Sequence, residues 1–164
     1  MYLNNKIYIY IFYLALILFF FPLFLFDPIN LQFQGNFSRS LNLIGESFYM
    51  SQSLSLPLFS INNFSYPPGT NLVYTDSLPF FGLICKFVSN IINIKFWYSP
   101  IYQLLSLSLN GFVAYLIFIK IIKNNLFSII AGLFFLFIPF HIDRFDRFPS
   151  LTSHFMLFLA YLIH

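Results

Sequence analysis

Charged side chains are scarce in this chain of 164 residues, which has only 8 basic and 5 acidic residues. Hydrophobic residues make up 59% of the sequence, and its mean hydropathy is +0.80. A water-soluble domain cannot be built from this composition, because too little polar side chain remains to cover its surface. The sequence therefore predicts an integral membrane protein, which has the lipid bilayer as a partner.

Cysteine and clustered basic residues are also nearly absent, which excludes several kinds of site. Cys85 is the only cysteine, so neither an intrachain disulfide nor a thiolate metal cluster can form. The net charge of +3 is small and scattered, whereas nucleic-acid binding needs a clustered basic face. We find no Gly-rich phosphate loop and no Ser-His-Asp arrangement. Nucleic acid is therefore not an expected partner, and neither nucleotide hydrolysis nor proteolysis has support.

Long uncharged runs predict an all-α fold, a polytopic bundle of transmembrane helices. We expect membrane helices over residues 7–26, 96–119 and 126–140, with an incomplete fourth over residues 152–164. The first run is long enough to cross a hydrocarbon core of roughly 30 Å. A cleaved signal peptide is the alternative, but the run is not followed by a small-residue cleavage site.

The segment 27–95 is expected to be an outer loop with helices of its own. Residues 79–92 are apolar but short, which predicts a re-entrant or interfacial helix. A second short helix is expected between residues 41 and 53, with Glu46 on its solvated surface.

The distribution of lysine predicts the orientation. With the N-terminus in the cytoplasm, Lys6, Lys120 and Lys123 lie inside, which satisfies the positive-inside rule. The same arrangement places all five acidic residues on the extracytoplasmic face. The last run has about thirteen residues, fewer than the roughly twenty that a span requires. We therefore expect the chain to be the N-terminal part of a longer domain, whose remaining helices complete the bundle.

Paired charges interrupt the apolar sequence at "HIDRFDRF". An interfacial ion pair between Asp143 and Arg147, spaced i,i+4, is one interpretation. A second is a site, because carboxylates of Asp143 and Asp146 suit a divalent cation such as Mg²⁺ or Mn²⁺. His141 lies beside them as a poorer ligand. Guanidinium groups instead suit a phosphate through forked hydrogen bonds, and the residues concerned are Arg144 and Arg147.

The order of these segments resembles the N-terminal part of the GT-C superfamily of membrane glycosyltransferases. In that superfamily the first outer loop carries an Asp near the end of the first helix, where this chain has Asp27 in "LFLFDPIN". The second outer loop supplies further acids, where it has Asp143 and Asp146. A closer likeness is to uncharacterised bacterial multi-helix members, in which a Pro-Gly segment leads into a "TDS.P" stretch, here "YPPGTNLVYTDSLPFFGLICKF".

The resemblance implies a bacterial inner-membrane enzyme that takes a sugar from a polyprenyl-phosphate donor. Asp27 would then be the base that accepts the proton of the acceptor hydroxyl. Three residues are further candidates: Asp76, His141 and His154. Asp76 is also suited to cap the helix that begins near Pro79, and an intramembrane His154 is suited to a structural hydrogen bond.

A non-enzymatic membrane protein, either a transporter fragment or an assembly subunit, is the rival interpretation. Transporters use polar residues near the bilayer midplane, and the candidates here are Asn110 and Gly111. Both residues also suit close helix packing.

Overall fold

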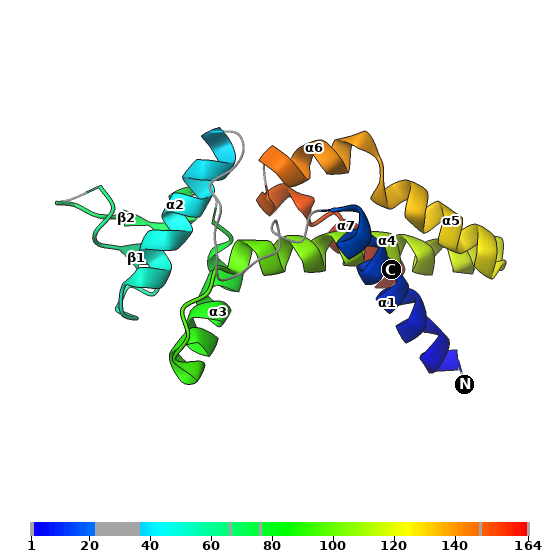
Figure 1. Cartoon of the computed structure of the whole chain (residues 1–164), viewed down its shortest axis with the longest axis horizontal. Coiled ribbons are helices and arrows are strands. Elements are labelled where there is room, and N and C mark those ends of the chain that lie inside the picture. Colours follow the sequence, from blue (N-terminus) through cyan, green and yellow to red (C-terminus); the bar gives the residue numbers. More distant parts are fainter. Residues whose placement is uncertain (1, 22–36, 66, 76, 148, 164) are drawn as a thin grey trace. The chain divides into compact units, whose positions relative to one another are not determined.

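Helices make up most of the chain in the computed structural model, which describes residues 2–21, 37–65, 67–75, 77–147 and 149–163 (Figure 1). The elements, in order, are α1 (Tyr2–Phe20), α2 (Phe37–Ser51), β1 (Ser60–Ile61), β2 (Thr70–Asn71), the 3-10 helix η2 (Leu72–Thr75), α3 (Pro79–Ile92), α4 (Tyr98–Ile122), α5 (Asn125–Leu136), α6 (Pro139–Arg147), the 3-10 helix η3 (Pro149–Thr152) and α7 (Phe155–Ile163). The predicted helical class is confirmed in this coarse form. The short antiparallel ladder of β1 and β2 was not predicted.

One helix among the described residues, α4, is long and apolar enough to cross a membrane. It contains an 18-residue stretch with a mean hydropathy of 1.9, and 44% of that stretch is buried. Three shorter apolar helices are Lys6–Phe20, Pro79–Ile92 and Asn125–Leu136. The described chain is thus mostly helical with one candidate membrane-spanning helix.

Proline explains where two expected helices were placed wrongly. α1 begins earlier than expected and ends at Phe20, since the residue before Pro22 is disfavoured in the α conformation. The helix expected over residues 126–140 is broken, because Pro139 cannot continue α5 and becomes the first residue of α6. The 12 residues of α5 extend only about 18 Å.

Two compact units divide the chain. Unit 1 contains residues 1–23, 103–145 and 151–164, and unit 2 contains residues 24–102 and 146–150. α4 supplies its first residues to unit 2 and all later ones to unit 1.

In unit 1, close backbone approach packs α1, α4 and α5 around Tyr13. The Tyr13 side chain is fully buried, and its hydroxyl donates to the carbonyl oxygen of Ile129 at 3.0 Å. A Cβ on Gly132 would collide with that hydroxyl and would lie 2.8 Å from the Gly111 carbonyl oxygen. Glycine is therefore required at this crossing, and the predicted packing role of Gly111 is confirmed.

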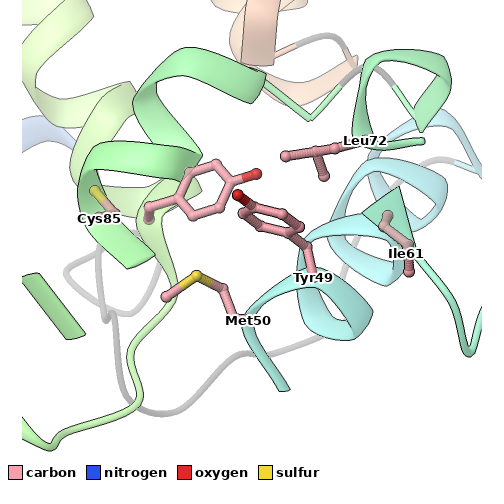
Figure 2. Close-up of a cluster of buried hydrophobic side chains, with 6 residues drawn as sticks. Tyr49, Met50, Ile61, Leu72 and Cys85 are labelled. Atoms are coloured by element: carbon pink, nitrogen blue, oxygen red, sulfur yellow. The ribbon is translucent and has the colours of Figure 1, made fainter. Parts of the chain in front are cut away.

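In unit 2, an apolar cluster joins α2, α3 and the β1–β2 ladder. Figure 2 shows Tyr49 in the middle of the cluster, with Cys85 and Met50 on one side and Ile61 and Leu72 on the other. The Tyr49 hydroxyl donates to the Leu58 carbonyl oxygen at 3.0 Å, so the polar end of this buried ring is satisfied.

The turn between the two strands has the backbone conformation that its sequence predicts. Gly69 has a φ of 71°, in the left-handed region that glycine adopts at no steric cost. The predicted cap Asp76 lies outside the described residues. Leu78 occupies the N-cap position of α3 and makes no side-chain capping bond.

The prediction that Glu46 lies on a solvated surface is wrong, because the structure buries its side chain. Its carboxylate accepts hydrogen bonds from the backbone N–H groups of Tyr98 and Ser99, the latter at 3.0 Å, and from the Ser99 hydroxyl. These donors lie in the first turn of α4, where N–H groups have no partner within the helix. Glu46 thus caps α4 from another helix, and the negative charge favours the positive end of the α4 dipole.

Burial raises the pKa of the Glu46 carboxyl to about 7, against the lowering effect of its hydrogen bonds from Ser99 and Tyr98. The folded state therefore holds a proton on Glu46 more tightly than the unfolded state does. This contribution to stability is fully present below the ordinary pKa and is lost as the pH rises through about 7.

We predict that Glu46→Ala lowers the free energy of unfolding by about 1–3 kcal/mol, because it leaves the first-turn N–H groups of α4 buried without an acceptor. Glu46→Gln retains one acceptor oxygen and should keep most of the stability at neutral pH. Denaturation of the two variants in the same detergent measures the difference.

Glu46→Gln should also lose the gain in stability that the wild type shows on acidification from about pH 7. Equal stability of Glu46→Ala and the wild type would contradict the capping role.

Candidate functional site

The candidate site is centred on α6, which begins where Pro139 interrupts the apolar sequence. This helix carries His141, Asp143 and Arg144 within its first two turns. The His141 side chain is only 2% exposed, whereas Asp143 is exposed and Arg144 is half-buried. One turn of helix thus presents a buried imidazole on one side and ionic groups toward its surface.

A pair of histidines is the distinctive feature of this site. The rings of His141 and His154 lie edge to face, with their centroids 4.5 Å apart. The ring centroids of Phe135 and His141 are 4.7 Å apart, and those of Phe140 and His154 are 5.4 Å apart. The two imidazoles therefore pack against aromatic rings of α5 and α6.

Each histidine has one ring nitrogen that is buried and unsatisfied. The Nδ1 atoms of His141 and His154 make no hydrogen bond to any described group. A buried polar atom without a partner costs about 1–3 kcal/mol, so each such atom in a folded protein needs an explanation. The pair therefore offers two hydrogen-bonding positions for a ligand with hydroxyl or phosphate oxygens.

Asn110 of α4 fixes the segment that carries His154. Its side-chain amide donates to the Thr152 carbonyl oxygen at 2.7 Å, and its side-chain oxygen accepts from the Phe155 backbone N–H at 2.6 Å. The first of these bonds is made to the last residue of η3. The second caps the first residue of α7. Asn110 is fully buried, so its polar groups serve the fold.

His141 is neutral at ordinary pH. Burial lowers its pKa to about 4, and the nearby His154 lowers it further in the same direction. A neutral imidazole keeps one nitrogen as an acceptor and the other as a donor. His141 therefore suits hydrogen bonding to a ligand better than proton abstraction.

Arg144 supplies a positively charged side chain to the candidate site. The carbon of its guanidinium group lies 5.0 Å from the centroid of the Phe140 ring, within the range of a cation–π contact. Such a contact orients the planar group, and an oriented guanidinium binds a phosphate through two parallel hydrogen bonds.

The structure brings together some of the predicted site residues and is silent on others. It joins His141 to His154 and places Asp143 and Arg144 on the same helix. Asp146 and Arg147 end α6, but their side chains lie outside what the structure describes. Asp27 and Asp76 lie outside the described residues. Within the described residues, no group of three or more His, Cys, Asp or Glu side chains could hold a metal ion. The divalent cation stays a prediction.

Sequence reasoning missed the aromatic rings that pack against the two histidines and the function of Asn110. Phe135 and Phe140 lie among many other phenylalanines, so nothing in the sequence distinguishes them. The helix break at Pro139 was the available signal, since it turns His141 back toward the segment that contains His154.

The chain belongs to the family described as Domain of unknown function (DUF6311). Residues 10–164 match the family, so every residue of the candidate site falls within the matched region. The description of DUF6311 names no activity. Comparison with curated proteins and with solved structures found no match.

We predict that the free energy of unfolding of His141→Phe decreases less on acidification than that of the wild type. The phenylalanine ring should preserve the contacts with Phe135 and His154. In the wild type, the pKa of His141 in the folded state is below its ordinary value of 6.5, so stability is lost as the pH falls from about 6.5 to about 4. The loss should be on the order of 1–3 kcal/mol and should shrink in the variant. Unfolding free energies across this pH range are the measurement.

His154→Phe is the matched comparison. It should retain most of the acid sensitivity, because burial is the larger cause of the His141 shift. An unchanged pH slope in His141→Phe would show that the folded protein does not hold His141 neutral.

Proposed function

We propose that this DUF6311 chain is part of a polytopic membrane protein that transfers a sugar from a polyprenyl-phosphate donor to an extracytoplasmic acceptor. The observation that carries the proposal is the His141–His154 pair, whose Nδ1 atoms are buried and unsatisfied, next to Arg144 on the helix that bears His141. Such a site can hold a sugar hydroxyl and a phosphate side by side. The GT-C resemblance of the sequence supplies the reaction class.

A bilayer environment is supported by the apolar surface of unit 1. Large hydrophobic side chains are exposed on three of its helices: Ile7, Tyr8, Ile11, Phe12, Phe19 and Phe20 on α1; Leu126, Phe127, Ile130 and Phe134 on α5; and Met156, Leu157, Tyr161 and Ile163 on α7. Apolar exposure on this scale marks contact with lipid or with further protein. α1, α5 and α7 would then accompany α4 in the membrane.

In the proposed reaction, the acceptor oxygen forms a bond to the anomeric carbon as the bond from that carbon to the phosphate oxygen breaks. The acceptor proton passes to a carboxylate, which the GT-C resemblance of the sequence assigns to Asp27, and polyprenyl phosphate leaves. Arg144 stabilises the phosphate, on which charge increases during the displacement. His141 and His154 orient the sugar by hydrogen bonding. Asp143, together with Asp146, would hold the predicted divalent cation, which would neutralise part of the phosphate charge.

The rival interpretation, a non-enzymatic membrane protein, loses its main polar candidate. Asn110 was the residue most suited to a midplane transport site, but both polar groups of its side chain bond to the segment that begins α7. The buried side-chain atoms without a partner among the described residues are instead Nδ1 of His141 and of His154 and the hydroxyl oxygens of Ser60 and Ser106.

We predict that Arg144→Gln lowers sugar transfer by about 10- to 100-fold, because it removes a charge-assisted contact to the phosphate. Asp27→Asn and Asp143→Asn should abolish transfer without lowering the amount of protein in the membrane. The assay follows a radiolabelled hexose from decaprenyl phosphate to endogenous acceptors, in membranes containing the product of the intact gene.

Lys123→Gln is the matched control for the loss of one positive charge, because Lys123 lies in the turn between α4 and α5. It should leave transfer unchanged. Full transfer by both Asp27→Asn and Asp143→Asn would refute the assignment of these residues.

A further inference from the structure

The helix α3 of unit 2 buries its one charged residue and exposes large apolar residues. Its buried residues are spaced i, i+3, i+4 and i+7 along one face: Gly82, Cys85, Lys86 and Ser89. Its exposed residues are the uncharged Asn90 and six large apolar residues: Phe80, Ile84, Phe87, Val88, Ile91 and Ile92. Since Lys86 is the only charged residue of α3, the exposed face carries no charge.

The buried face is fully engaged within unit 2. The Lys86 ammonium donates to the Tyr49 carbonyl oxygen at 2.6 Å and lies 3.9 Å from the centroid of the Tyr49 ring. The Ser89 hydroxyl donates to the Ile94 carbonyl oxygen at 2.7 Å. These contacts fix which face of α3 is outward, so the apolar exposure is a property of the packed unit.

A cleft of about 230 Å³ lies where the chain leaves α3 and approaches α4. It is lined by Ser47, Met50, Ser51, Lys95, Phe96 and Trp97. Among these described lining residues Lys95 is the only charged one, so the cleft favours an anion. The exposed Ile94 directly precedes Lys95 in the sequence. The Lys95 side chain therefore comes a few residues after the apolar face of α3.

The two serines supply acceptors to the same cleft. The Ser47 hydroxyl donates to the Ile44 carbonyl oxygen at 2.7 Å, and the Ser51 hydroxyl donates to the Phe48 carbonyl oxygen at 2.9 Å. Their hydrogens are thus committed, while their oxygen lone pairs can still accept. An anion that fits this cleft would carry hydroxyl groups of its own.

We propose that this cleft binds the headgroup of an anionic phospholipid of the phosphatidylglycerol type, while the outward face of α3 rests among the acyl chains. The phosphate contacts Lys95, and the glycerol hydroxyls donate to Ser47 and Ser51. Trp97 lies at the headgroup level, where its amphipathic ring is favoured. This lipid site is independent of the sugar-transfer site, and its test does not require transfer activity.

Trp97 is the only tryptophan of the chain and therefore reports on the cleft directly. The full chain is reconstituted in mixed vesicles of phosphatidylcholine and phosphatidylglycerol, in which one lipid or the other carries brominated acyl chains. Brominated phosphatidylglycerol should quench Trp97 more strongly than brominated phosphatidylcholine at the same mole fraction. Lys95→Gln should reduce the preference about fivefold, the share of one basic residue near an anionic surface.

Three further variants distinguish binding in the cleft from a general effect of charge. Lys123→Gln removes one positive charge away from the cleft and should leave the preference for phosphatidylglycerol intact. Lys95→Arg keeps the positive charge in the cleft and should also preserve this preference. Ser47→Ala with Ser51→Ala should lower the preference for phosphatidylglycerol over phosphatidic acid, which lacks the glycerol hydroxyls, while the preference for anionic lipid remains.

Equal quenching by the two brominated lipids in the wild type would overturn the proposal. An equal loss of preference in Lys95→Gln and Lys123→Gln would do the same, because net charge would then explain the result. A change in Trp97 emission caused by inorganic phosphate in detergent, without any lipid preference in vesicles, would show a phosphate site and contradict a lipid site.

Discussion

The hydrogen bonds from the first turn of α4 to the Glu46 carboxylate are the constraint on which much of unit 2 depends. A helix of 25 residues has a positive end whose N–H groups need acceptors, and here the acceptor comes from α2. The bonds fix α2 against the beginning of α4. Because α4 continues into unit 1, the same helix also carries Asn110, which holds the start of α7. Buried polar side chains thus organise both units, within a sequence whose composition is dominated by apolar residues.

The elements were predictable from sequence where hydrophobic runs are bounded by polar or turn-forming residues. α3 has the bounds expected for the short apolar segment at residues 79–92, and the helix expected between residues 41 and 53 is α2. The α5–α6 break was missed because the apolar run continues through Pro139. The rule that proline begins a helix more readily than it continues one was the relevant signal.

Side-chain partners were less predictable, because they depend on residues distant in the chain. Glu46 lies in "GESF", which is polar enough to suggest a solvated surface, and its partners lie 52 and 53 residues away. His141 and His154 were each candidates, but no spacing rule pairs residues of two helices separated by a 3-10 turn. The charged cluster on α6 was the visible feature of the sequence, whereas two of the buried unsatisfied atoms lie on the imidazoles of His141 and His154.

The position of Cys85 has a consequence for chemical labelling. Its thiol is buried in α3 against the Tyr49 cluster, and burial together with the charge of Glu46 raises its pKa to about 11. Reaction with a maleimide requires the thiolate, which is scarce at neutral pH under these conditions. The rate of alkylation of this single thiol therefore measures how often the α3 core opens, with no contribution from any other cysteine of the chain.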